Sequence, residues 1–449
     1  MRTRLTVSLT AVSCLLLSIG CAAEADPTPL DVAAKTSSAA TSCSVRGSTG
    51  DIIFDTDLGG LISGAPAFAG GTAYIGQFEG GTMFFAVGDD GTVLKSANIA
   101  YSVESSPAVS PDGTTVYVDT VNLNGLDIPA DTLSDGVTSI WDGVGAQALD
   151  AGTLALVGAA GFANTGADGS PAVSADGTSV YVGSVEGPAG LPEQIWSFAG
   201  TSMDLNWDFD PPGWSYSSPV LDARQNLYMG SEEAGSGMDV GHFYSLTRNG
   251  RERWSLETEG SACGGPAIYT KTTRTWLLIR TFSGHLLKVS DRGVKNWEVD
   301  LNTYGWGVPV LGANNGTIYV TTTYPVDSTL DTHLMSLLAL SERDGSVRWE
   351  FPINNANGST PVVGDRAIYI VDDDGTVFAV DKTTGAELWS TPTGHPSYVG
   401  YAGLNACGAL QFGSTDGHYV SVQTESSGME RTSDCPTYRC DYGRTGNQF

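Results

Sequence analysis

Acidic side chains are the most abundant groups in this sequence that could carry out chemistry. The 449 residues contain 50 Asp and Glu against 22 Lys and Arg, which gives a formal net charge of −28. Most aspartates lie in turn-like stretches such as DDDG at residues 372–375, where a carboxylate caps backbone N–H groups. The alternative is that acidic sites bind divalent cations. The sequence has no paired acid–base motif, nucleophile elbow or phosphate loop, so we assign no catalytic residue and predict a non-enzyme.

Cysteine and histidine, the other reactive residue types, are few. Seven cysteines are present, and two of them, Cys14 and Cys21, lie in an N-terminal segment of a different kind. The remaining five are Cys43, Cys263, Cys407, Cys435 and Cys440. The sequence has no C-x-x-C pair and only five scattered histidines, so we do not expect a zinc site. In an exported protein, disulfides are the default expectation, and the odd count leaves at least one thiol unpaired.

The N-terminus has the features of an export signal. Arg2 and Arg4 precede an apolar run over residues 5–19, which is too short for a comfortable membrane span. Residues 18–21, Ser-Ile-Gly-Cys, resemble a bacterial lipobox, which implies a signal peptide over 1–20 and lipidation of Cys21. Ordinary cleavage after Ala25 is the alternative. Residues 21–48 are rich in Ala, Ser, Thr and Pro and are expected to form a flexible tether. Either cleavage predicts export, to the outer membrane or periplasm as a lipoprotein, or to the exterior as a secreted protein.

The strong negative charge argues against nucleic acid or an anionic lipid surface as partner. A high negative charge also keeps a protein soluble in a crowded or salty compartment, and this explains the charge without any partner.

A repeated unit organises the rest of the chain. A short small-Pro-small strand recurs around Pro66, Pro107, Pro171, Pro219, Pro266, Pro309 and Pro361, with a degenerate eighth copy around Cys407. Each copy is followed by a turn, two further strands, and a fourth strand that carries Trp four residues after a turn glycine, as in DGSVRW. Four short antiparallel strands repeated eight times predict an all-β, eight-bladed β-propeller over residues 49–425, with seven blades as the alternative. Residues 426–449 form a Cys-containing tail that we expect to pack near the closure of the ring.

The fourth-strand aromatic residues are expected to fill the gaps between neighbouring blades. They are Phe54, Trp207, Trp254, Trp297, Trp349 and Trp389, whereas Lys95 and Leu156 occupy the corresponding place in the first two units.

These units resemble the pyrroloquinoline-quinone-type (PQQ-like) propeller repeat. AVDKTTGAELWSTPTG, at residues 379–394, is a close match to its signature, and CPTYRCDYGRTG, at residues 435–446, resembles a segment common near the end of this family, with Cys435 in place of Trp. The resemblance implies one of two functions. Quinoprotein dehydrogenases hold PQQ and calcium in the channel against a disulfide between adjacent cysteines, whereas the non-enzymatic branch includes the lipoprotein propeller of the outer-membrane barrel-assembly machinery. The chain has no Cys-Cys pair, which favours the non-enzymatic branch and no cofactor; PQQ or Ca²⁺ remains the alternative.

A binding role requires an exposed face, and aromatic residues gather in the segments between successive units. They are Trp214, Tyr216, Tyr304, Trp306, Tyr398 and Tyr401. On one rim of a propeller they could contact a protein or peptide, since aromatic residues carry much interface energy. The alternative is that they pack between blades. We therefore expect a monomeric, lipid-anchored scaffold for an envelope protein, with outer-membrane assembly as its most concrete role and recognition of a polysaccharide or extracellular partner as a further alternative.

The isolated strand at the N-terminal end of the repeats should close the ring. Aligned on TTGAELW, the STGDIIF of residues 48–54 places Gly50 at the turn glycine and Phe54 at the Trp position. It is therefore expected to be the fourth strand of the last blade. Cys43 would then enter where the tail departs, so a disulfide from Cys43 to Cys435 or Cys440 could staple the seam; a local Cys435–Cys440 bridge is the alternative.

Overall fold

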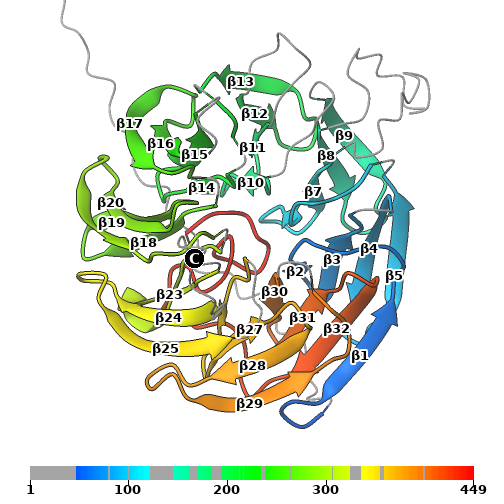
Figure 1. Ribbon diagram of the computed structural model, residues 1–449. Coiled ribbons are helices and arrows are strands. Elements are labelled where there is room, and N and C mark those ends of the chain that lie inside the picture. The colour runs from blue at the N-terminus through cyan, green and yellow to red at the C-terminus, as the bar shows by residue number, and fades with distance from the viewer. Residues whose placement is uncertain are drawn as a thin grey trace, which may run out of the picture.

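The computed structural model describes residues 47–448 except 79–80, 100, 122–144, 162–168, 185–193, 212, 216, 234–237, 263, 306, 324–334, 354–357 and 398–399. Its strands form eight separate four-stranded antiparallel sheets. Figure 1 shows these sheets arranged as blades around a central axis, with the C-terminal segment in the middle of the ring. The fold is therefore an eight-bladed β-propeller, as the repeats predict, and the seven-bladed alternative is wrong.

Strand order within each blade follows chain order from the axis outward, except in the last blade. Blade 1 contains β2 (Ala67–Ala69), β3 (Thr72–Gly76), β4 (Met83–Gly88) and β5 (Val93–Asn98); blade 2, β6 (Ala108–Val109), β7 (Thr115–Asp119), β8 (Gly145–Asp150) and β9 (Leu156–Gly161); blade 3, β10 (Ala172–Val173), β11 (Ser179–Gly183), β12 (Ile195–Ala199) and β13 (Leu205–Phe209); blade 4, β14 (Val220–Leu221), β15 (Leu227–Glu232), β16 (Val240–Leu246) and β17 (Glu252–Glu259).

Blade 5 contains β18 (Ala267–Lys271), β19 (Arg274–Arg280), β20 (His285–Ser290) and β21 (Lys295–Asp300); blade 6, β22 (Val310–Leu311), β23 (Thr317–Thr321), β24 (Met335–Ser341) and β25 (Val347–Ile353); blade 7, β26 (Val362–Val363), β27 (Ile368–Val371), β28 (Thr376–Val380) and β29 (Glu387–Pro392); blade 8, β30 (Ala402–Leu404), β31 (Ala409–Gly413), β32 (His418–Gln423) and β1 (Ile52–Asp57). The short 3₁₀ turn η1 (Ala313–Asn315) is the only helical element in the part of the chain that the structure describes.

The N-terminal strand closes the ring, as its alignment with the repeats predicts. β1 pairs antiparallel with β32, with Phe54 opposite Ser421 and Asp57 opposite His418. The ring thus has no open blade at its seam, and β32 has no free edge.

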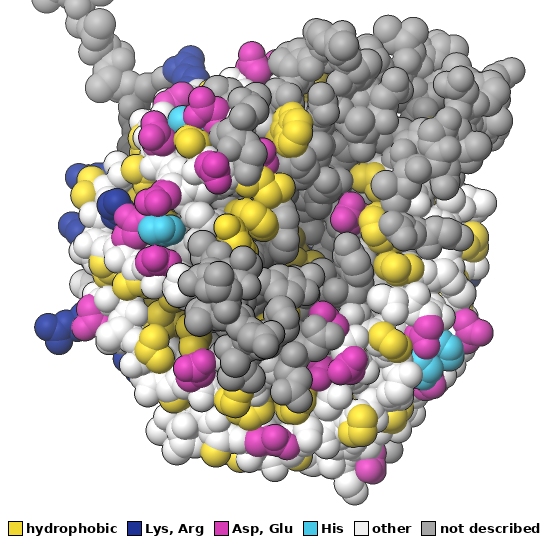
Figure 2. Space-filling model, in the orientation of Figure 1, with side chains coloured by type: hydrophobic (Ala, Val, Ile, Leu, Met, Phe, Trp, Pro, Cys, Tyr) yellow, Lys and Arg dark blue, Asp and Glu magenta, His cyan; other side chains and the backbone are white. Residues whose placement is uncertain are grey.

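The two ends of the ring differ because each blade is an antiparallel meander. Turns between the first and second strands and between the third and fourth lie at one end, which we call the turn face. Connections between the second and third strands, and from the fourth strand to the next blade, lie at the other end, the loop face. Figure 2 looks onto the loop face, where hydrophobic side chains gather around a central hollow and acidic side chains lie scattered around it.

Neighbouring blades interlock through the fourth-strand aromatic residues. The turn glycine of each following blade lies against the preceding indole, so that a Cβ on Gly250 would come within 2.6 Å of Trp207, and one on Gly385 within 2.7 Å of Trp349. The indole N–H then donates to that same turn: Trp254 Nε1 donates to the Asp291 carbonyl at 2.8 Å. Phe54 makes the equivalent contact with the blade 1 turn at Gly91. These glycines have φ of 72–81° and no room for a side chain, so both their conformation and the close contact require glycine.

Between blades 2 and 3 the sizes of the two partners are exchanged: the fourth strand carries a glycine, and the turn of the following blade carries the larger residue. In blade 2 the residue at positive φ in the turn is Leu154, and the residue four positions later is Gly158, which pairs with Ala148 as Trp349 pairs with Ala339. Gly158 therefore occupies the Trp position. The sequence prediction of Leu156 is wrong because it counted four residues from Gly152 instead of from Leu154. The turn of blade 3 then closes directly onto Gly158: its own positive-φ residue is Met203, and a Cβ on Gly158 would lie 3.2 Å from the Met203 side chain and 2.2 Å from the Thr201 carbonyl.

We expect Gly158→Ala to destabilise the ring much more than Gly152→Ala. The added Cβ at 158 meets backbone, which cannot move aside cheaply, and overpacking of this kind costs about 1–3 kcal/mol. A Cβ on Gly152 approaches only the Asp150 side chain, at 3.5 Å, so the change there should stay within about 0.5 kcal/mol. Thermal unfolding of the two variants measures the difference. Equal melting temperatures would contradict the assignment of Gly158 to the docking position.

The C-terminal tail, residues 426–448, contacts the innermost strand of every blade and reaches well beyond the seam. Six inner strands donate backbone N–H groups to its carbonyls: Phe68 to Tyr442, Val109 to Gly443, Val173 to Thr445, Leu221 to Gly446, Leu311 to Cys435 and Val363 to Pro436, all at 2.8–2.9 Å. Blade 5 donates from Thr270 N to the Asp434 carboxylate, and blade 8 accepts from Arg444 at Ala402. The tail therefore satisfies N–H groups that would otherwise be unpaired at the inner sheet edges.

The structure joins Cys435 to Cys440, the local alternative. The staple from Cys43 to either residue is therefore wrong, because both sulfurs are taken within the tail. Cys43 itself lies outside the described residues. Cys407 is also disulfide-bonded.

Among the described residues, none belongs to a helix long and apolar enough to cross a membrane. The predicted signal peptide, Cys21 and most of the tether precede residue 47, outside the described part of the chain.

Candidate interaction face and central channel

The aromatic residues of the connections between blades have different surroundings on the loop face. Trp214 is half-buried and its carbonyl accepts from Glu232 N, whereas Tyr304 is 37% exposed and its ring lies 5.3 Å from that of Phe282. Tyr401 faces the axis, where it stacks on Tyr438 of the tail with ring centroids 5.3 Å apart. Of these three, Trp214 and Tyr304 are partly exposed, while Tyr401 packs against the tail. Tyr216, Trp306 and Tyr398 lie outside the described residues.

Two buried arginines of the tail fill the centre of the ring. Arg444 is 1% exposed and donates to the carbonyls of Pro66, Ala402 and Tyr438, which joins blades 1 and 8 to the tail. Arg439 is 2% exposed and donates to the carbonyls of Pro171 and Pro219 in blades 3 and 4. Three of their acceptors are the prolines of the small-Pro-small motif. The motif thus presents carbonyl oxygens to the axis, and guanidinium groups, with several donors in one plane, can bridge them.

Burial controls the ionisation of these central groups. Desolvation lowers the pKa of Arg444 to about 10, which leaves it charged at neutral pH. Desolvation also raises the pKa of Asp119, whose carboxylate is fully buried at the end of β7 with no hydrogen-bond partner among the described residues, well above its usual range; the charge of Arg439 acts in the opposite direction. Burial therefore favours the neutral form of the Asp119 carboxyl, since an unpaired buried charge is costly.

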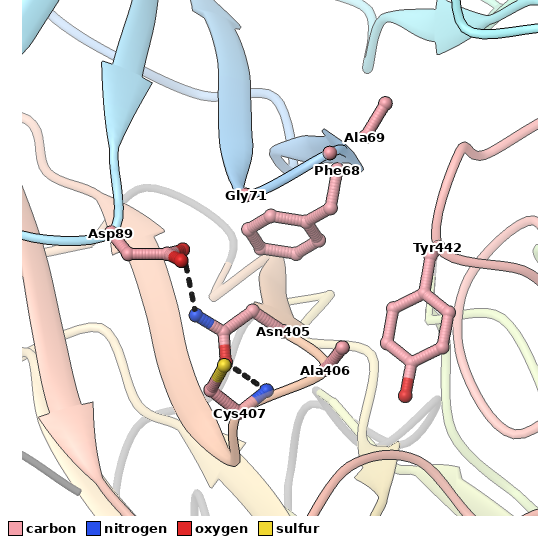
Figure 3. Close-up of a pocket in the computed structure, with 9 residues that line it drawn as sticks. Phe68, Ala69, Gly71, Asp89, Asn405, Ala406, Cys407 and Tyr442 are labelled. Atoms are coloured by element: carbon pink, nitrogen blue, oxygen red, sulfur yellow. Dashed lines mark hydrogen bonds between the residues drawn. The ribbon is translucent and has the colours of Figure 1, made fainter. Parts of the chain in front are cut away.

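A small pocket opens between blades 1 and 8 on the turn face (Figure 3). Phe68, Tyr442 and Cys407 line it, and Asn405 Nδ2 of blade 8 reaches 3.4 Å to Asp89 Oδ1 of blade 1. The amide oxygen of Asn405 also accepts from Cys407 N at 2.9 Å, so its side chain is held from both ends. This arrangement braces the two blades that meet at the seam.

A second, open groove on the turn face of blades 5 and 6 has the opposite charge to the rest of the protein. Lys271, Arg274, Lys288 and Arg343 line it with Trp276, and Glu342 lies at its base. Burial alone would raise the pKa of Glu342, but hydrogen bonds from Lys271 and Lys288 outweigh this and lower it. The carboxylate is therefore ionised, and it neutralises part of the positive charge of the groove.

The described residues do not provide the seat that the PQQ dehydrogenases use. The sequence has no adjacent pair of cysteines, and the Cys435–Cys440 bridge spans a five-residue step within the tail. The tail side chains Arg439, Arg444 and Tyr438 bond to Pro171, Pro66 and Ser218, which lie just before the inner strands β10, β2 and β14, so tail groups occupy the centre of the ring there.

Comparison with known proteins agrees with this geometry. A family model described as outer membrane protein assembly factor BamB matches residues 283–428. The curated outer membrane protein assembly factor BamB of Yersinia pestis is 25% identical over 315 residues, which cover 56% of this chain and 76% of that protein. The chain is a PQQ-like repeat propeller that resembles BamB.

Solved structures extend the likeness in fold to the whole ring. BamB from Moraxella catarrhalis has a TM-score of 0.61 at 16% identity, over 83% of this chain and 99% of that one. The quinohemoprotein alcohol dehydrogenase from Comamonas testosteroni also has a TM-score of 0.61, at 12% identity, over 85% of this chain and 77% of that one. At these identities the comparison shows a shared fold, and a BamB-like propeller and a quinoprotein propeller have similar scores.

Sequence reasoning did not find the role of the tail as the hub of the ring. The segment CPTYRCDYGRTG was expected to pack near the closure and to hold a disulfide, but no role was predicted for its two arginines and one aspartate, which lie among cysteines and tyrosines. Charged residues in such a stretch are a signal of buried polar bonding. The acidic loop-face cluster containing His395 and His418 was also missed.

Proposed function

We propose that the protein is a non-catalytic scaffold of the bacterial cell envelope, anchored by lipid at Cys21, that binds another envelope protein during outer-membrane assembly. The observation that carries the proposal is the resemblance to BamB, found in sequence over residues 283–428 and in fold around the ring. The absence of an adjacent cysteine pair and the filling of the axis by the tail make a quinone-dependent role less well supported.

The distribution of charge indicates which part of the ring meets the partner. Residues 58–216, which span blades 1–3, contain 18 Asp and Glu but only one Lys or Arg, so their formal charge is 1 − 18 = −17. By contrast, residues 217–353 of blades 4–6 contain 15 acidic and 12 basic residues, a formal charge of 12 − 15 = −3. A concentrated negative region attracts a basic surface and raises the rate of encounter at low ionic strength. We therefore propose that the partner presents a basic surface to blades 1–3, and that it meets their loop face, where Asp208 and Asp210 are exposed and Trp214 is half-buried.

Strand β13 offers a matched test of this orientation. Asp208 lies at its loop-face end and Asp210 just after it, in the segment that leads to Trp214, whereas Asp204 lies just before its turn-face end; all three aspartates are exposed. Affinity isolation of the full chain from detergent-solubilised envelopes should enrich a component of the outer-membrane assembly apparatus. We expect Asp208→Lys with Asp210→Lys to weaken that binding about tenfold or more, equivalent to about 1.4 kcal/mol, and to reduce its salt dependence.

Asp204→Lys is the control and should bind as the unaltered protein does. Trp214→Ala should reduce capture with an unchanged melting temperature. A large fall in melting temperature for Trp214→Ala would instead place that side chain in the packing between blades. Enrichment of general chaperones alone, or equal binding by the Asp204 and Asp208/Asp210 variants, would contradict the proposal.

A further inference from the structure

Three segments meet at the seam of the ring and bring two imidazoles and two carboxylates together on the loop face. Asp55 lies on β1, His418 begins β32, and His395 lies in the connection from β29 to β30. Asp55 Oδ2 is 2.9 Å from His395 Nε2, and its Oδ1 is 2.6 Å from His418 Nδ1. The donor atoms of the three residues all lie within 4.8 Å of one another. Figure 2 shows histidine and acidic side chains together at the lower right, over β1 and β32.

A fourth residue orients the cluster from outside. Asp416 Oδ2 lies 2.9 Å from His395 Nδ1, and Asp416 Oδ1 in turn accepts from Ser414 Oγ at 2.5 Å. This bond directs the other ring nitrogen, Nε2, toward Asp55 and His418. A carboxylate that holds the distal nitrogen of a ligating histidine is the usual outer arrangement of zinc sites, where it fixes the tautomer and strengthens the ligand.

The backbone around the cluster is well fixed. Thr415 N donates to the Pro396 carbonyl at 2.7 Å, and Leu58 N donates to the Gly417 carbonyl at 2.8 Å. The side chains are also only partly exposed: 17% for His395, 26% for His418 and 39% for Asp55. A ligand set held on three bonded segments needs little rearrangement to bind an ion.

The donor atoms of the cluster lie around one small space. Both ring nitrogens of His395 lie 2.9 Å from carboxylate oxygens, and the ring is stacked 4.0 Å from the ring of His418. The charge of a divalent ion between Asp55 and the two rings balances the combined charge of the Asp55 and Asp416 carboxylates.

We propose that Asp55, His395 and His418 form a site for a divalent transition metal, best fitted to Zn²⁺, with Asp416 as the residue that positions His395. Two imidazole nitrogens and one carboxylate oxygen suit zinc and its borderline neighbours better than Ca²⁺ or Mg²⁺, which prefer all-oxygen sites. Three protein ligands leave the fourth tetrahedral position for water. The bound ion links the N-terminal strand, the third strand of blade 8 and the exit from blade 7, so it reinforces the closure of the ring.

Metal titration of the EDTA-dialysed full chain tests the site. We expect one equivalent of Zn²⁺ by calorimetry, a melting temperature raised by about 3 °C or more at saturating metal, and visible absorption of Co²⁺ typical of tetrahedral coordination. His418→Ala and His395→Ala should abolish all three signals. Asp416→Asn should keep one equivalent but weaken affinity about 10- to 100-fold.

His285→Ala is the matched control, because His285 also lies between two carboxylates, Glu298 and Glu259, but has no second histidine. This variant should bind Zn²⁺ as the unaltered chain does. Should a ligand variant fail to fold, Asp416→Asn, which alters a group 44% exposed, still separates the outcomes. Three results would overturn the proposal. They are no binding at 1 mM Zn²⁺, loss of binding in His285→Ala, and full affinity in Asp416→Asn and the ligand variants.

Discussion

Removal of residues 49–58 is expected to lower the melting temperature of the ring by about 15 °C or more, or to prevent folding, although the segment is ten residues long. The deletion removes the whole of β1, and so the pairing along β32 and the packing of Phe54 and Leu58, which are 9% and 8% exposed. Each buried apolar side chain of this size contributes about 1.5–3 kcal/mol, and each lost ladder hydrogen bond about 0.5–1.5 kcal/mol. It also leaves β32 as an open edge beside blade 1.

Complementation distinguishes a missing strand from a misfolded chain. A synthetic peptide spanning residues 48–60 should add to the open edge and recover much of the lost melting temperature, because strand addition restores the same backbone bonds. A peptide with Phe54→Ala should recover less. An unchanged melting temperature after the deletion would show that blade 8 is stable as a three-stranded sheet and would contradict the closure.

Arg444→Met is expected to cost about 3–5 kcal/mol, more than a typical substitution in a protein of this size. The guanidinium, 1% exposed, bonds to carbonyls of blade 1, blade 8 and the tail, and its removal leaves these acceptors buried without partners. Arg444→Lys should rescue little, because an ammonium on a single stem cannot reach acceptors on three segments at once. Thermal unfolding and hydrogen exchange of the inner-strand amides of Phe68 and Val109 measure the effect.

Arg431→Met is the control, since Arg431 is exposed in the same tail. It should change stability by no more than about 0.5 kcal/mol. Equal stability of the Arg444 and Arg431 variants would show that the backbone bonds of the tail suffice to hold the centre of the ring.

Local pattern was enough to predict the blades, because each blade repeats one arrangement of turn, strand and aromatic residue. Gly385 and Trp389 predict each other at a spacing of four, and this spacing also placed Phe54 correctly in β1. It failed in blade 2, where the turn residue at positive φ is Leu154 rather than a glycine. At this contact the fourth-strand residue is small and the turn residue of the next blade is large. A search for a turn glycine followed by a tryptophan cannot detect such a contact.

The seam cluster and the central hub could not be predicted because their members are far apart in the chain. Asp55 and His418 are 363 residues apart, and Arg444 and Pro66 are 378 apart. Counting scattered histidines led to the expectation of no zinc site, yet ring closure brings two of the five beside the N-terminal strand. The alignment of β1 with the repeats predicted the closure but not which side chains would meet across it.

The late pairing of β1 has a consequence for the chain as it is synthesised. This strand emerges first but finds its partner only after residue 418 has emerged, so it must remain single while nearly the whole ring is synthesised. An apolar strand in that state is a template for wrong pairing and aggregation. Its sequence, DIIFDTD, carries three aspartates around its apolar residues. We expect these charges to limit wrong pairing while the strand is unpaired, so their replacement by Ser or Thr should lower the yield of folded protein before it changes the folded ring.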